Sequence, residues 1–302
     1  ERSPDSRPSG SPGYVPLAAS REYISPPVQE RPVCTLTLAW RVFEDAPVVV
    51  AANRDELLDR ESEPPAVRTG DPSFVAPRDA AAGGTWIGYN EAGVFAGITN
   101  RWVDVPDGGE RSRGLLVRDA LGAQSAEEAR ERVEDAVAAD TYDGFNLVVA
   151  ERTGREQGES TSPPASAAAS VPTSPTAYLF EWDGDLRVRE LDPGVHVVVN
   201  VGLDGESFDS PYPERGAEQA RDAERVREAL SPRPDESASE WLDRAADVLG
   251  DHEYGVCVHE PDRGFGTRSS SLLTLFRSGD ADFRFADGPP CETAFRPVEG
   301  QI

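Results

Sequence analysis

The chain has 302 residues, enough for one large domain or two ordinary ones, and it carries 30 Lys+Arg against 55 Asp+Glu, a formal net charge of −25. An acidic surface of this kind has no basic stripe to neutralise phosphates, which argues against nucleic acid as a partner. Three cysteines are too few for a disulfide framework, and no window holds the roughly 18 apolar residues of a membrane helix. We therefore expect a soluble, cytoplasmic protein without membrane insertion.

The first 33 residues differ in composition from everything that follows. Residues 1–33 are rich in Pro, Ser, Arg and Glu and show no apolar periodicity, which predicts either disorder or an over-extended gene start. The chain begins with Glu1, and Val33 stands directly before Cys34. Because GTG, a valine codon, can serve as an initiator, we hypothesise that translation starts at position 33 as Met. Residues 34–302 are then expected to form a single domain.

From Cys34 onward, apolar patterns predict alternating groups of strands and helices. Strands are expected at 34–42 (half-buried), 47–53 (buried), 84–90 and 94–100 (a hairpin), 144–151, 177–182, 186–191, 196–201, 254–259, 269–276 and 282–286. Helices are expected at 111–121, at 125–139 with Ser125 as N-cap and Glu128 three residues on, at 213–230 and at 237–249. This order suits an α+β domain of stacked antiparallel sheets with helices outside.

One segment inside this pattern is of low complexity. Residues 155–176 are polar and repetitive, and we predict a disordered insertion between two hairpin strands, because added loop length costs little free energy.

Short motifs are ambiguous when each is taken alone. The stretch Asn53–Glu56 (NRDE) follows a strand and reads most simply as a turn, in which Asn53 or Asp55 caps a helix beginning at DELLDR. Trp86, Phe95 and Trp102 are expected to be core residues rather than the walls of a ligand site.

Four potential zinc ligands occur near the C-terminus, namely His252, Cys257, His259 and Cys291. Their spacing is irregular and lacks paired C-x-x-C or H-x-x-x-H signatures. We therefore predict no metal site, with Cys257 as a buried thiol, His259 at a strand end and Cys291 as a surface thiol.

Taken together and in order, several motifs are far more specific. They are NRDE (53–56), GGTW (83–86), ITN (98–100), RSRG (111–114), YDGFNL (142–147), the stretch from His196 and Asn200 to PYP (211–213), and FGTRSS (265–270). This set resembles the NRDE family, the group named after transport and Golgi organization protein 2, whose members typically begin Met-Cys followed by a strand. The resemblance implies a four-layer αββα sandwich of N-terminal nucleophile (Ntn) hydrolase type. The acidic, Lys-free composition in turn resembles that of haloarchaeal proteins.

The chemistry expected of such a protein centres on Cys34. An N-terminal cysteine carries its own base, because its α-amine has a pKa of roughly 7.7–8.0, close to operating pH. Asp55 is expected to hold that amine, and Arg54 to lower the pKa of the thiol. The resemblance further implies that Asn200, together with Asn100, donates to the oxyanion, and that Arg268 orients the nucleophile or binds a substrate carboxylate.

Three function classes remain open at this stage. The first is an N-terminal-cysteine amidohydrolase acting on a small amide or acyl compound, without a cofactor. The second is a non-catalytic protein of the same fold that binds a lipid-like or haem-like ligand, and the third is an interaction protein. Neither the substrate nor the oligomeric state follows from the sequence.

Overall fold

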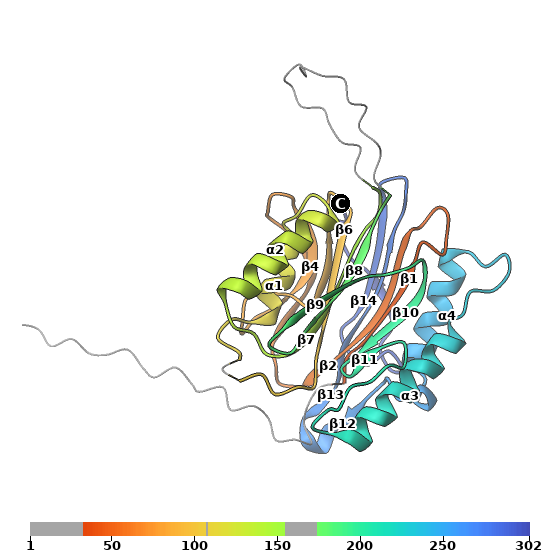
Figure 1. Cartoon of the computed structure of the whole chain (residues 1–302). Coiled ribbons are helices and arrows are strands. Elements are labelled where there is room, and N and C mark those ends of the chain that lie inside the picture. Colours follow the sequence, from red (N-terminus) through yellow and green to blue (C-terminus); the bar gives the residue numbers. More distant parts are fainter. Residues whose placement is uncertain (1–32, 107, 155–173) are drawn as a thin grey trace, which may run out of the picture.

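A computed structural model describes residues 33–106, 108–154 and 174–302 of the chain. Two antiparallel sheets pack face to face, and a pair of helices covers the outer face of each sheet (Figure 1). The predicted α+β fold, a four-layer αββα sandwich, is therefore confirmed. Within the described residues, no helix is long and apolar enough to cross a membrane.

The first sheet contains the strand that begins after Cys34. Its strands are ordered β11-β10-β1-β2-β13-β14-β15, with β12 paired to β13. They are β1 (Thr35–Trp40), β2 (Val48–Leu57), β10 (Gly194–Val199), β11 (Gly202–Leu203), β12 (His259–Glu260), β13 (Phe265–Leu275), β14 (Ala281–Ala286) and β15 (Arg296–Pro297). Helices α3 (Pro213–Ala229) and α4 (Ala238–Gly250) cover its outer face.

The second sheet runs in sequence order from β3 to β9. Its strands are β3 (Ser62–Arg68), β4 (Phe74–Asp79), β5 (Ile87–Asn90), β6 (Val94–Asn100), β7 (Phe145–Glu151), β8 (Ala177–Trp182) and β9 (Leu186–Glu190). Helices α1 (Arg113–Ala120) and α2 (Ala126–Ala139) pack on its outer face.

Strand β1 shows how the layers are built from a period of two. Leu36, Leu38 and Trp40 point into the core between the sheets, whereas Ala39 belongs to the core under α3 and α4. All six residues of β1 are buried, so the prediction of a half-buried strand is wrong. The reason is that β1 lies in the middle of a sheet that is covered on both faces.

Several local predictions are confirmed by the hydrogen bonding. The Ser125 side chain accepts from the Glu128 backbone N–H at 3.1 Å and caps α2. Strands β5 and β6 form the expected hairpin, and Gly93 in its turn has φ +84, a conformation that favours glycine. Strands β7 and β8 pair on either side of the predicted insertion, of which residues 155–173 lie outside the described residues, as do residues 1–32.

Two further predictions are wrong. The segment after Asn53 does not turn into a helix, because β2 continues through NRDE to Leu57 and pairs with β13. The stretch 254–259 is not a strand either; only His259 joins the two-residue strand β12. In both places, local propensity does not determine the secondary structure, and pairing with β13 sets which residues form a strand.

Candidate functional site

Cys34 lies at the end of β1, between two neighbouring strands. Thr35 pairs with Asn53 of β2 and with Val199 of β10. In this antiparallel register the preceding residue, Cys34, lies opposite Arg54 on one side and Asn200 on the other. The Cys34 backbone N–H donates to Asn200 Oδ1 at 2.9 Å. The strand register alone thus brings together three of the predicted site residues.

Asn200 is completely buried and links both sheets to helix α3. Its Oδ1 also accepts from Gln219 Nε2 at 2.8 Å, and its Nδ2 donates to the backbone oxygen of Asn100 at 2.7 Å. One N–H of the amide predicted to face an oxyanion thus donates to Asn100, while the side-chain oxygen accepts from the Cys34 nitrogen. Gln219 was not predicted as part of the site; the only signal in the sequence is its place on the apolar face of a helix.

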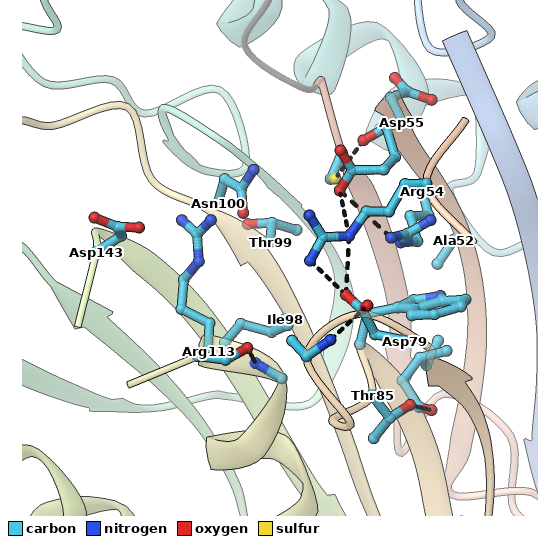
Figure 2. A pocket seen from close by; sticks show the side chains of 18 of the residues that line it. Ala52, Arg54, Asp55, Asp79, Thr85, Ile98, Thr99, Asn100, Arg113 and Asp143 are labelled. Atoms are coloured by element: carbon cyan, nitrogen blue, oxygen red, sulfur yellow. Dashed lines mark hydrogen bonds and ion pairs between the residues drawn. The ribbon is translucent and has the colours of Figure 1, made fainter. Parts of the chain in front are cut away.

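A cavity of about 370 Å³ lies beside Cys34 at one end of the space between the sheets (Figure 2). The half-buried Cys34 side chain lines it, as do apolar side chains from both sheets, including Leu36, Ile87 and Ile98. Asn100 and Arg113 also face this cavity, and Arg113 Nη1 donates to the Gly144 backbone oxygen at 2.8 Å. The volume falls within the range of small-molecule sites, roughly 300–1,000 Å³.

The Arg54 side chain lines the cavity from β2 and is almost fully buried. Its guanidinium lies 4.2 Å from the centre of the Trp86 ring and 3.4 Å from Glu56 Oε2, and its buried Nη1 has no hydrogen-bond partner among the described residues. Burial lowers the pKa of Arg54, while Glu56 and Cys34 act in the opposite direction. Trp86 was predicted as core, but it lines the cavity and stacks on this cation, whereas Phe95 and Trp102 are buried core residues.

Asp55 follows on the opposite face of β2. Its Oδ1 accepts from Thr267 Oγ1 at 2.6 Å, and its buried Oδ2 has no hydrogen-bond partner among the described residues. Burial raises the pKa of Asp55 well above its ordinary value, against the opposing effects of Thr267, Arg215 and Arg54. In this form of the chain the carboxyl group retains its proton at pH values where an exposed aspartate has lost it.

The thiol of Cys34 is strongly held in its neutral form. Its Sγ donates to the Asp55 backbone oxygen at 3.7 Å. Burial, followed by the charge of Asp55, raises the pKa of Cys34 to about 12, although Arg54 acts to lower it. With Val33 attached, Cys34 therefore has neither an amine of its own nor a usable thiolate at neutral pH.

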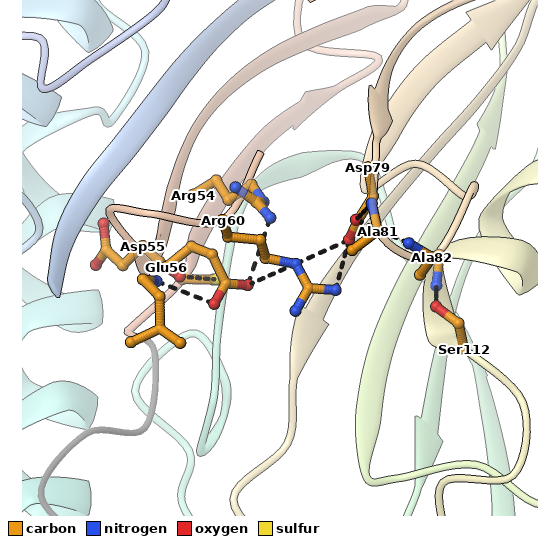
Figure 3. A network of polar contacts seen from close by, with 11 residues as sticks. Arg54, Asp55, Glu56, Arg60, Asp79, Ala81, Ala82 and Ser112 are labelled. Atoms are coloured by element: carbon orange, nitrogen blue, oxygen red, sulfur yellow. Dashed lines mark hydrogen bonds and ion pairs between the residues drawn. The ribbon is translucent and has the colours of Figure 1, made fainter. Parts of the chain in front are cut away.

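A network of ion pairs fixes one rim of the cavity (Figure 3). Arg60 bridges Glu56 at 3.8 Å and Asp79 at 2.6 Å, and Asp79 Oδ1 also accepts from the backbone N–H groups of Ala81 and Ala82 at 2.9 and 3.1 Å. Because the Asp79 backbone also bonds to Gly83 and Gly84, the network connects the NRDE strand to the start of GGTW at this rim.

Arg268 does not reach the site. The pairing of β13 with β2 shifts between Thr267 and Ser269, which makes Arg268 the extra residue of a bulge. Its guanidinium pairs with Asp287 at 2.7 Å, and it does not line the cavity. Sequence separation alone could not place this side chain, because a one-residue bulge changes the face to which it points.

The match to a family model and to a curated relative agrees with the motif pattern. A bovine protein, the transport and Golgi organization protein 2 homolog from Bos taurus, is 25% identical over 256 residues, covering 78% of this chain and 84% of that protein. Among solved structures, a penicillin V acylase from Agrobacterium tumefaciens is similar with a TM-score of 0.44 at 12% identity, covering 89% of this chain and 98% of that one. A conjugated bile acid hydrolase from Clostridium perfringens has a TM-score of 0.49 at 10% identity, covering 89% and 97%. The model of the family described as Transport and Golgi organisation 2 matches residues 33–284, most of the sequence, and the chain belongs to that family.

Proposed function

We propose that this protein is an N-terminal-cysteine amidohydrolase acting on a small amide or related acyl compound. The observation that carries the proposal is the position of Cys34, whose nitrogen is 2.9 Å from Asn200 Oδ1 and whose side chain lines a cavity of about 370 Å³. An amine generated at that nitrogen would already have an acceptor, and the sulfur beside it would already border a space for a substrate.

The proposal requires that the bond between Val33 and Cys34 is absent from the active form. Val33 is 8% exposed and packs into the core under α3 and α4, so a protease would not reach this bond in the folded chain. The amine at Cys34 would therefore have to be generated before the chain folds.

Release of the amine would change the electrostatics of the site in the direction that catalysis needs. A protonated α-amine near Asp55 favours the carboxylate and adds hydrogen-bond donors to a site in which Asp55 Oδ2 has no partner within the described part of the chain. The same amine, close to its pKa at neutral pH, can take the proton of the thiol, and Arg54 then stabilises the thiolate.

The reaction follows from these groups. The Cys34 sulfur attacks the amide carbonyl carbon, and the oxygen of the tetrahedral intermediate accepts from the side-chain amide of Asn100 in the cavity wall. The C–N bond breaks as the α-ammonium gives its proton to the leaving amine. Water then hydrolyses the thioester, releases the acid and restores the thiol.

The test is activity-based labelling of native protein followed by intact mass and peptide mapping. We expect the active species to begin at Cys34 and to be modified by an electrophilic acyl analogue at that sulfur. The Cys34→Ser variant should fold normally, resist labelling and fail to hydrolyse N-acyl amides. A native protein that retains Val33 and still hydrolyses amides would refute the proposal, whereas a free Cys34 that binds ligands without turnover would favour the non-catalytic alternative.

A further inference from the structure

A second cluster of reactive side chains lies outside the cavity, near the start of β13. It consists of His252 in the 3₁₀ helix after α4, Cys257 in the loop that follows, His259 in β12 and Cys291 in the loop after β14. One ligand atom from each residue lies within 4.8 Å of all the others. The sequence-based argument against a metal site relied on irregular spacing, and the fold brings the four residues together despite that spacing.

The distances match those of a tetrahedral metal site. Cys257 Sγ lies 3.6 Å from Cys291 Sγ and 3.5 Å from His259 Nε2, and His259 Nε2 lies 3.1 Å from Cys291 Sγ. Zn–S bonds of about 2.3 Å and Zn–N bonds of about 2.0–2.1 Å at tetrahedral angles place two sulfurs about 3.8 Å apart, and sulfur and nitrogen about 3.5 Å apart. The His252 and His259 rings are 5.0 Å apart between centroids, which leaves room for an ion between them.

A disulfide explains these distances less well. Both cysteines are free thiols in the structure, and their sulfurs are separated by much more than the roughly 2.05 Å of an S–S bond. A disulfide would also leave the two imidazoles without a role. Two thiolates and two imidazoles are, in contrast, the donor set that selects zinc in a closed, structural site.

We propose that His252, Cys257, His259 and Cys291 bind one structural Zn²⁺ ion. The ion would join the loop after α4 to the C-terminal segment, two parts of the chain that are far apart in sequence. Its four protein ligands leave no open coordination position, so the role is structural rather than catalytic.

The zinc-binding loop also supports the back of the candidate active site. The Val256 backbone oxygen accepts from Asn53 Nδ2 at 2.8 Å, and the Val258 N–H donates to Thr267 Oγ1 at 2.9 Å. Thr267 in turn donates to Asp55 Oδ1. A metal that fixes this loop therefore fixes, through one hydroxyl group, the orientation of the Asp55 carboxyl group.

The experiment measures the metal content of full-length protein purified without chelators or added metal. We expect about one zinc per chain by inductively coupled plasma mass spectrometry, and loss of the zinc in Cys291→Ser, whose exposed position makes a folding defect improbable. Co²⁺ exchanged into the site should give the visible bands and thiolate charge-transfer absorption of a tetrahedral site. Removal of zinc by a chelator should lower the melting temperature, and added zinc should restore it.

Two matched controls use the remaining histidine and cysteine of the chain. His196→Gln and Cys34→Ser should both keep the zinc. Since Cys34→Ser is expected to lose hydrolysis and keep zinc, failure of this proposal and failure of the proposed activity are distinguishable. The zinc proposal is overturned if reduced native protein contains no zinc, if Cys291→Ser retains it, or if peptide mapping finds a Cys257–Cys291 disulfide in the native protein.

Discussion

Removal of the Asn200 side chain is the perturbation whose effect the structure determines most sharply. In Asn200→Ala, three polar groups lose their partner: the Cys34 N–H, Gln219 Nε2 and the Asn100 backbone oxygen. Gln219 Oε1 already lacks a hydrogen-bond partner within residues 33–106, 108–154 and 174–302, so that side chain would lose its remaining bond as well. Each buried group without a partner costs about 1–3 kcal/mol. Taking the low end for each, because water can enter from the cavity, gives a loss of about 3 kcal/mol.

Urea unfolding followed by circular dichroism measures this loss, with Asn100→Ala as the matched control. The Asn100 side chain lines the cavity, and the backbone oxygen that Asn200 uses survives the substitution. We expect Asn100→Ala to leave the free energy of unfolding nearly unchanged and to lower kcat by about 10²–10³, the cost of one oxyanion donor. If the free energy of unfolding of Asn200→Ala lies within about 1 kcal/mol of the wild-type value, the assignment of Asn200 as the link between the layers is wrong.

Three further predictions concern neighbouring groups. Arg54→Gln should abolish labelling of Cys34, whereas Arg268→Gln should leave it at the wild-type rate; the reverse order would restore Arg268 to the site. In chains that retain Val33, burial raises the pKa of Cys34 to about 12, so its alkylation rate should keep increasing with pH well beyond the roughly 8.5 of an ordinary thiol, and a plateau near that value would contradict the assigned environment. In the same chains the raised pKa of Asp55 gives a stability that is fully present below its unfolded pKa of about 3.9 and is lost as pH increases toward the folded pKa. Urea unfolding at a series of pH values should therefore show a steeper decline for wild type than for Asp55→Asn, and equal slopes would exclude a buried, protonated Asp55.

The local pattern of the sequence was sufficient for most of the framework. Period-two alternation and β-branched runs identify β1, β2, β7 and β10, and Ser125 with Glu128 identifies the start of α2. These signals are reliable because each depends on neighbours within a few residues. Strands β3 and β4 were missed, since their residues lack a clean alternation and they become strands by pairing along the edge of the second sheet.

The sequence also identified Cys34, Arg54, Asp55, Asn100 and Asn200 as candidate site residues, because the motifs that contain them occur in a recognisable order. Which groups each of these side chains contacts was decided by the tertiary structure. Strand register places Cys34 between Arg54 and Asn200, and burial sets the direction of the pKa shifts of Asp55 and Cys34.

Other features could be decided only by the fold. A bulge in β13 turns Arg268 away from the cavity, and helix α3 brings Gln219 to Asn200. The clearest case is the cluster of two histidines and two cysteines, whose spacing carries no metal signature. Sequence spacing indicates metal ligands when they occur as closely spaced pairs, whereas here Cys291 follows Cys257 by 34 residues and is brought back beside Gly250, at the end of α4, by the folding of the chain.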